Sequence, residues 1–257
     1  MLFWNTTYWR YTTDLHRENL GIEIPRLEDL AKTGQHSWRQ LVKYNQELRC
    51  VGFYDPHRFR ADVPQYQAYQ KIIDEHLVRS TWVKQITDVA RADICEGRPY
   101  LALHFRNKTG EGCHFFLDVR GSECEALIPT ISYVADIVTV IVVDYMQKFR
   151  LDCLYVAHPL WSYEIVDHLA AKIPRRNIYT SADISAEKHP ELELFKEDMY
   201  FLSLLEQEIC ARSSAFIGCG RSNWSIFVWK ERLAAGRVAS YLLKQMPGIP
   251  KELQAHL

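Results

Sequence analysis

The sequence has no excess of charge of either sign, because 31 lysines and arginines are balanced by 32 aspartates and glutamates. A basic excess is typical of proteins that bind nucleic acid or acidic membrane surfaces, so the composition points away from both classes of partner. The seven cysteines form no Cys-x-x-Cys pair and no cysteine–histidine spacing of the kind that holds zinc. We therefore expect neither a nucleic-acid partner nor a metal site.

Long apolar runs are missing as well. The most apolar window, residues 131–146, includes Asp136 and Asp144, and it is shorter than the roughly 20 apolar residues that cross a bilayer. Residues 1–8 are too polar to form the core of a signal peptide. We therefore expect no membrane span. The compartment stays open, since an odd number of cysteines fits a reduced protein as well as one with a few disulfides.

The composition is otherwise that of a globular protein, with 47% hydrophobic and 25% charged residues. Apolar side chains spaced three and four apart predict a helix over residues 64–92, which Gly97 and Pro99 end. Short apolar runs then alternate with helical segments. The predicted strands are residues 100–105, 152–157, 177–180 and 215–217, and the predicted helices are residues 131–149, 161–171, 198–213 and 222–235. Residues 107–125 are expected to form a polar loop.

This alternation of strands and helices predicts a doubly wound, parallel α/β sheet of the Rossmann-like type. We expect the sheet and its helices to form one domain over residues 99–257. Residues 1–98 show a less regular pattern outside the helix just named, and we expect them to form a mainly helical N-terminal region.

A glycine-rich turn follows the predicted strand at residues 215–217. It leads into Ser222, Asn223 and Ser225, which open the last predicted helix. The first turn of a helix carries unpaired backbone N–H groups and a partial positive charge, so this arrangement is typical of a phosphate site. The alternative is that Ser222 only caps the helix, as serine often does.

A second element suited to anions lies at the end of the strand predicted at residues 100–105. His104 and Arg106 end this strand, and ligands of open α/β sheets bind beyond the carboxyl ends of the strands. The planar fork of arginine grips two phosphate oxygens at once. An arginine alone at such a place is also typical of a surface ion pair, but two anion-favouring strand ends in one sheet favour a shared phosphate site.

These residues carry a resemblance to a known family. Residues 99–237 resemble the C-terminal half of the GDP-fucose protein O-fucosyltransferases. Residues 104–106 are similar to the family's His-x-Arg motif, residues 222–225 to its serine-rich turn, and residues 230–232 to its Glu-Arg pair.

The resemblance implies a GT-B fold, in which residues 99–257 would be the half that binds the nucleotide sugar. It implies inverting transfer of fucose from GDP-fucose to a serine or threonine hydroxyl of an acceptor protein, or to another hydroxyl acceptor. No metal or other cofactor is implied, because Arg106 and the helix terminus would neutralise the diphosphate. Membership would place the protein in the endoplasmic reticulum or elsewhere in the secretory pathway.

The resemblance also implies roles for single residues. Arg106 would hold the β-phosphate of GDP and stabilise the charge that grows there as the bond to fucose breaks. The other residues that the resemblance assigns to GDP-fucose binding are His104, Ser222, Asn223, Trp224 and Ser225.

The sequence also departs from the family's pattern. No Gly-Arg-x-Gly-Asn loop precedes residue 100, so we expect a shortened N-terminal half. The nearest carboxylate after Arg106 is Glu111, one or two positions later than the family's aspartate, and the family's Ala-Thr-Asp strand end is replaced by Ala157, His158 and Pro159. The catalytic base is therefore not assigned, and Glu111 and His158 are both candidates.

Two alternatives to fucose transfer stay open. The chain is also compatible with a catalytically impaired family member that acts as a nucleotide-binding or interaction module. It is further compatible with a transferase that uses another nucleotide sugar, because phosphate contacts alone do not select the base.

Overall fold

The chain consists of two compact units, Met1–Ile72 and Ile73–Leu257. The structure, a computed structural model, describes residues 76, 78–193, 198–247 and 249–251, all in the second unit. The side chains of residues 108, 109, 112–123 and 160 are outside this description. Most of the expected helical N-terminal region, residues 1–98, lies outside the described residues, so it stays a prediction.

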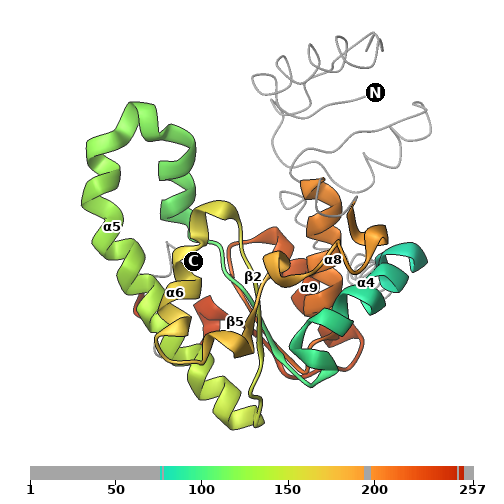
Figure 1. The fold of residues 1–257 in the computed structure, drawn as a ribbon. Coiled ribbons are helices and arrows are strands. Elements are labelled where there is room, and N and C mark those ends of the chain that lie inside the picture. The colour runs from blue at the N-terminus through green and yellow to red at the C-terminus, as the bar shows by residue number, and fades with distance from the viewer. Residues whose placement is uncertain (1–75, 77, 194–197, 248, 252–257) are drawn as a thin grey trace, which may run out of the picture. The chain divides into compact units, whose positions relative to one another are not determined.

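The centre of the second unit is a parallel sheet of five strands in the order β3-β2-β1-β4-β5 (Figure 1). The strands are β1 (Leu101–His104), β2 (Leu154–Ala157), β3 (Ile178–Tyr179), β4 (Ala215–Gly218) and β5 (Ser240–Leu242). This order is that of a doubly wound sheet, so the predicted fold class is confirmed. The sequence did not predict β5, because three residues are too short a run for its alternation to stand out.

Helices cover both faces of the sheet (Figure 1). They are α4 (Thr81–Asp93), α5 (Lys108–Phe149), α6 (Glu164–Ala170), α8 (Met199–Arg212) and α9 (Asn223–Ala234). The apolar side chains of α5 and α6 pack on Leu101 and Leu103, whereas those of α4, α8 and α9 pack on Tyr100 and Ala102. Successive side chains of a strand point to opposite faces, which is why both core clusters draw on β1.

Short 3₁₀-helices complete the connections. They are η3 (Cys95–Gly97), η4 (Leu160–Ser162), η5 (Arg175–Asn177), η6 (Ser181–Asp183), η7 (Pro190–Leu192) and η8 (Leu243–Gln245).

The winding of the chain reverses at β1. The crossovers from β1 to β2 and from β2 to β3 use α5 and α6 on one face, whereas the crossovers into and out of β4 use α8 and α9 on the other. β1 pairs directly with β4, and His104 lies opposite Gly218 in the register. The connections that leave these neighbouring strands therefore diverge, which opens a crevice at their carboxyl ends.

The prediction of one unbroken helix over residues 64–92 is wrong in the part that the structure describes. Val78, Arg79 and Ser80 are not helical, and α4 begins after Ser80, whose Oγ accepts a hydrogen bond from the backbone N–H of Val83. A serine that caps a new helix explains the interruption. Residues 64–75 lie outside the described residues.

The predicted polar loop over residues 107–125 is also wrong, because α5 begins at Lys108. Asn107 supplies the start signal. Its side-chain Oδ1 accepts the N–H of Gly110 and its carbonyl accepts the N–H of Glu111. The glycines and polar residues that follow hid this asparagine cap from the sequence pattern. The predicted helix at residues 131–149 forms the rest of α5.

Part of α5 is long and apolar enough to count as a candidate membrane span by length and composition, namely Cys124–Phe149. Within this segment Val134, Val138 and Val142 are buried against the sheet. The expected absence of a membrane span stays a prediction.

A disulfide joins Cys95, in η3, to Cys153, which directly precedes β2. Cys124 is disulfide-bonded as well, whereas Cys210 and Cys219 are buried cysteines outside these bonds. The bond between Cys95 and Cys153 ties the end of the α4 segment to the centre of the sheet.

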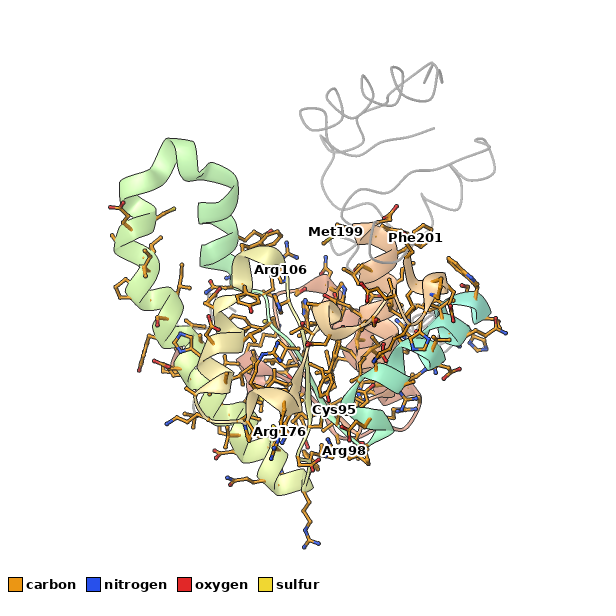
Figure 2. The ribbon with its side chains drawn as sticks, viewed as in Figure 1. Cys95, Arg98, Arg106, Arg176, Met199 and Phe201 are labelled. Atoms are coloured by element: carbon orange, nitrogen blue, oxygen red, sulfur yellow. A yellow bond between two sulfur atoms is a disulfide. The ribbon has the colours of Figure 1, made fainter. Side chains whose placement is uncertain are left out.

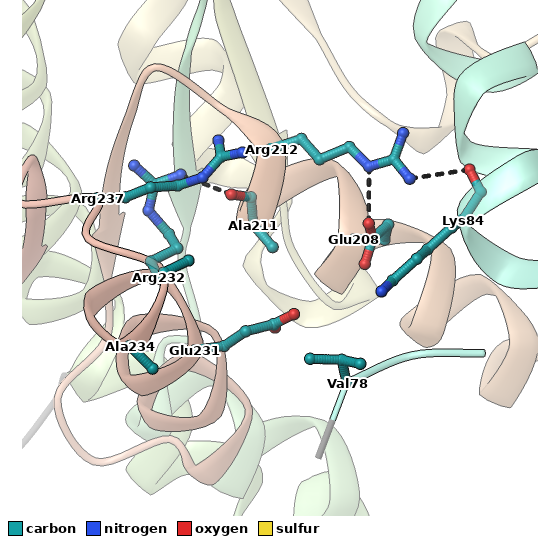
Figure 3. A pocket seen from close by; sticks show the side chains of 10 residues that line it. Val78, Lys84, Glu208, Ala211, Arg212, Glu231, Arg232, Ala234 and Arg237 are labelled. Atoms are coloured by element: carbon teal, nitrogen blue, oxygen red, sulfur yellow. Dashed lines mark hydrogen bonds and ion pairs between the residues drawn. The ribbon is translucent and has the colours of Figure 1, made fainter. Parts of the chain in front are cut away.

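A charged cluster joins α4, α8 and α9 around a cavity of ≈ 250 Å³ (Figure 3). Glu208 accepts hydrogen bonds from Arg79 and Arg212, and Glu231 is paired with Arg79. Burial alone would raise the pKa of Glu208, but the hydrogen bonds and charges of Arg79 and Arg212 hold it below its ordinary value.

Arg232, beside this cavity, has a structural role. It is 1% exposed, and its guanidinium donates to the carbonyls of Cys210, Ala211 and Ser213 and to Oγ of Ser240. Burial lowers the pKa of Arg232 to about 10, so the side chain remains charged at neutral pH. It joins the end of α8 to the start of β5.

We predict that Arg232→Met lowers the free energy of unfolding by about 3–5 kcal/mol, because the carbonyl oxygens of Ala211 and Ser213 lose the guanidinium that donates to them inside the core. Urea unfolding followed by circular dichroism measures the change. Arg237→Met is the control, since Arg237 is exposed nearby and its replacement is expected to change stability by less than about 0.5 kcal/mol. Equal stability of the two variants would contradict the structural role of Arg232.

Candidate functional site

A cavity of ≈ 240 Å³ lies at the carboxyl ends of the central strands. Its wall includes His104 at the end of β1, Arg106 two residues later, and His158 in the turn after β2. α8 contributes Glu206, and the start of α9 contributes Ser222 and Trp224. Side chains from both sides of the winding reversal therefore meet in one cavity. Figure 2 shows Arg106 at this end of the sheet, with Cys95, Arg98 and Arg176 at the other.

Arg106 is held by the Cys219 thiol, in the loop after β4, and by a carboxylate. Its backbone N–H donates to Sγ of Cys219 over 3.1 Å. Its side chain forms a two-pronged ion pair with Glu111, in which Nε is 3.0 Å from Oε2 and Nη2 contacts Oε1. A guanidinium has five N–H groups, so the edge formed by Nη1 and the second hydrogen of Nη2 stays open to a ligand.

His104 is fixed between two residues of α9. Its Nδ1 lies 2.5 Å from Oγ of Ser225, and its ring stacks on Trp224 with centroids 4.0 Å apart. Nε1 of Trp224 donates to Oγ of Ser203, which holds the indole in place. The cavity thus has a flat aromatic wall whose orientation is set by hydrogen bonds on both sides.

Ser222 is the N-cap residue of α9, but its hydroxyl makes no capping hydrogen bond. Ser222 is only 1% exposed, and its Oγ has no hydrogen-bond partner among the described residues. A buried hydroxyl without a partner costs about 1–3 kcal/mol. Simple capping therefore does not account for Ser222, whereas a ligand in the cavity would supply the missing partner.

The approach of α9 to β4 depends on one glycine. A Cβ built on Gly218 would lie 2.8 Å from Cβ of Ser225 and 2.9 Å from the ring of Phe216. Only a residue without a side chain allows the first turn of α9 to lie this close to the end of β4.

The structure brings together only some of the predicted site residues. His104, Arg106, Ser222 and Trp224 line the cavity. Glu111, Asn223 and Ser225 are absent from the described lining: Glu111 faces Arg106, Asn223 is exposed, and Ser225 is fully buried against His104. The binding and catalytic roles assigned to all of the predicted site residues, whether or not they line the cavity, remain predictions.

Glu206 is a residue of the cavity wall that sequence reasoning did not single out. It is half-buried, and Tyr155 donates to its Oε1 over 3.2 Å. Burial of the carboxyl raises the pKa of Glu206 to about 8, against the opposing effect of the Tyr155 hydrogen bond. Such a shift marks functional sites. In the sequence, Glu206 differs in no visible way from Glu208 two residues later, which serves the structural cluster.

His158 also faces the cavity. Its Nδ1 lies 3.0 Å from the carbonyl oxygen of Pro159, and its ring meets Tyr163 edge to face at 5.6 Å. Burial lowers the pKa of His158 below its ordinary value, although the Pro159 hydrogen bond opposes this. The ring is therefore neutral at pH 7.

Among the described residues, no group of three or more histidine, cysteine, aspartate or glutamate side chains is arranged to hold a metal ion. Arg106 is the cation that the cavity itself offers to an anionic ligand.

Comparisons with known proteins reveal similarity in structure alone. No protein-family model and no curated protein sequence matches the chain. Crystal structures of POFUT1 in complex with GDP and with GDP-fucose resemble it at 13% and 12% identity, each with a TM-score of 0.54 over 94% of this chain and 72% of that one. The apo form of POFUT1 matches with a TM-score of 0.51 at 13% identity, over 93% of this chain and 73% of that one. The chain therefore shares the fold of a protein that has been crystallised with GDP and GDP-fucose.

Proposed function

We propose that the protein binds GDP-fucose in this cavity and transfers fucose to a serine or threonine hydroxyl of an acceptor protein. The observation that carries the proposal is the meeting of Arg106 and the unpartnered hydroxyl of Ser222 in one cavity at the winding reversal. Ligands of doubly wound sheets bind at this point of the fold. The similarity to POFUT1 supports the proposal at the level of the fold.

The diphosphate would lie between Arg106 and the start of α9. The open edge of the Arg106 guanidinium suits two oxygens of one phosphate, and Glu111 keeps the fork oriented by holding its other edge. The first turn of α9 adds a partial positive charge, and Ser222 adds a hydroxyl donor. Because these groups supply the charge that the leaving diphosphate needs, the proposed transfer requires no metal.

Glu206 is suited to select guanine. An ionised carboxylate accepts two parallel hydrogen bonds, and guanine presents two donors, N1–H and the 2-amino group, on one edge. Adenine and uracil do not present this pair of donors. Contacts to the phosphates do not distinguish one base from another. The Glu206 carboxylate on the cavity wall would distinguish guanine from adenine and uracil.

The disulfide between Cys95 and Cys153 supports a place in the secretory pathway. Structural disulfides form and persist in oxidising compartments and are rare in the reducing cytosol. We therefore propose that the protein resides in the secretory pathway.

A second candidate function is nucleotide binding without transfer. The ion pair between Arg106 and Glu111 favours it, because a paired guanidinium has less charge to offer a leaving group. Calorimetry with GDP, followed by an assay for GDP released from GDP-fucose, distinguishes the two. GDP binding with no release would favour the binding protein.

We predict that Arg106→Ala lowers the rate of GDP release from GDP-fucose by about 10²–10³-fold, because the growing phosphate charge loses its cation. Arg106→Lys is expected to recover little, since a point charge cannot grip two oxygens in one plane. A coupled assay for GDP measures both rates, with and without EDTA, which is expected to have no effect. Arg176→Ala is the control, because Arg176 is exposed at the other end of the sheet. Normal activity of Arg106→Ala would contradict the assignment.

We predict that Ser222→Ala leaves stability unchanged or raises it, because it removes a buried hydroxyl that has no partner. A helix-capping serine would instead cost about 1 kcal/mol on replacement. The affinity for GDP is expected to fall by about 5–10-fold, the value of one hydrogen bond. Thermal unfolding and calorimetry measure the two effects, and Ser214→Ala, at an exposed serine, is the control. Lost stability with unchanged affinity would show that Ser222 is only a cap.

We predict that GDP binding strengthens as the pH rises from 6.5 to 8.5. In the empty cavity Glu206, with a pKa of about 8, is mostly protonated at pH 7 and ionises as the pH passes 8. Since guanine needs the ionised form, binding at pH 7 releases on the order of one proton per GDP. Calorimetry in buffers of different ionisation enthalpy measures this proton. In Glu206→Gln the release and the preference for GDP over UDP disappear; Glu191→Gln, at an exposed glutamate, keeps both. Proton release that survives in Glu206→Gln would exclude this role.

A further inference from the structure

We propose that His158 is the general base that takes the proton from the acceptor hydroxyl during sugar transfer. The inference rests on the proposed function and adds to it the base, which the sequence left between Glu111 and His158. The observations that support it are the place of His158 on the cavity wall and the hydrogen bond that fixes its ring.

The sheet places His158 close to the phosphate-binding end of β1. In the parallel register His104 lies opposite Ala157, and the N–H of Phe105 donates to the carbonyl of Ala157 over 3.0 Å. His158, the first residue after β2, is thus level with Phe105, one residue before Arg106. Paired strands lie about 4.8 Å apart. A sugar held at Arg106 would therefore have His158 beside it.

The hydrogen bond to Pro159 determines which nitrogen can act. A carbonyl oxygen only accepts, so Nδ1 of His158 carries the proton and donates it to Pro159. Nε2 is then the nitrogen with the free lone pair. In the part of the chain that the structure describes, no group hydrogen-bonds to Nε2. An oriented ring with a free Nε2 is the arrangement that a histidine base requires.

Burial lowers the pKa of His158 and so keeps this ring neutral, and the charged and titratable groups around the cavity do not favour a positive charge on it. From β1 and the loop after it, His104 and Arg106 face the cavity, and a cation there opposes a second one on His158. From α8, Glu206 is protonated at neutral pH and offers little negative charge to stabilise an imidazolium. Tyr163, before α6, contributes an uncharged ring edge.

The other candidate base is engaged elsewhere. Both oxygens of Glu111 contact the Arg106 guanidinium, and Glu111 does not belong to the described lining of the cavity. A carboxylate paired with an arginine is a weak base. We therefore assign Glu111 as the residue that positions Arg106.

The proposed step balances without any further reactant. The acceptor oxygen forms a bond to C1 of the sugar while the bond from C1 to the β-phosphate oxygen breaks. The electrons of the broken bond remain on that phosphate oxygen beside Arg106. The hydroxyl proton moves to Nε2 of His158, and the imidazolium later loses it to water.

The test uses the full chain with GDP-fucose as donor and water as acceptor, because water needs the same deprotonation. We expect His158→Gln to lower kcat for GDP release by about 10²–10⁴-fold while the Kd for GDP changes less than about twofold. In the wild type, log kcat rises with pH and levels off above a pKa lower than 6.5, and this rise is absent in His158→Gln. His168→Gln is the matched control, since His168 lies on α6 and pairs with Asp136.

Each alternative outcome is decisive. A His158→Gln variant with wild-type kcat and an unchanged pH profile overturns the assignment while the proposed function stands. A wild-type protein that binds GDP but releases no GDP from GDP-fucose overturns the assignment of His158, and it favours nucleotide binding without transfer. A wild-type protein that binds no GDP overturns the proposed function itself. NMR titration of the His158 ring gives a readout without turnover, and a ring that is protonated on Nε2 when neutral also contradicts the proposal.

Discussion

The pairing of β1 with β4 is the constraint on which the site depends. These two strands are far apart in sequence, yet their register sets His104 opposite Gly218, so the loops that follow them leave the sheet at one edge. The helices after β1 and β4 then cover opposite faces, and the crevice between them receives Arg106 from one loop and Ser222 from the other. Neither residue forms a site alone. The cavity exists because backbone hydrogen bonds hold the two strand ends together.

The two arginines that the sequence pattern emphasised serve opposite purposes. Arg232 is enclosed by carbonyl oxygens of α8 and its loop, so its donors are used within the fold. Arg106 uses one edge of its guanidinium on Glu111 and keeps the other toward the cavity. The difference between the two side chains lies in the number of N–H donors that remain for a ligand. A guanidinium held along one edge loses little further freedom when it grips an anion with the other.

Sequence patterns predicted the parts of the structure that depend on local periodicity. The central strands, α8 and α9 follow from apolar runs and glycine-rich turns, and Arg106 follows from its place at a strand end. The start of α5 at Asn107 and the interruption before α4 depend on single capping side chains, which polar surroundings hide. The sequence could not predict Glu206 as a residue of the site, for a different reason. Its shifted pKa arises from burial beside Tyr155, a neighbour distant in sequence, and the sequence alone gives no measure of that burial.

Two groups of the cavity wall are held neutral by the same cause. Burial raises the pKa of Glu206 and lowers that of His158, so neither carries charge at pH 7. A permanently ionised Glu206 would repel the diphosphate that Arg106 attracts, whereas a neutral one ionises only when donors of a base replace water around it. A permanently charged His158 would have no lone pair for a hydroxyl proton. Under the proposed function, desolvation thus leaves Arg106 as the charge that an incoming nucleotide meets. It keeps Glu206 protonated until guanine binds and His158 ready to accept the hydroxyl proton.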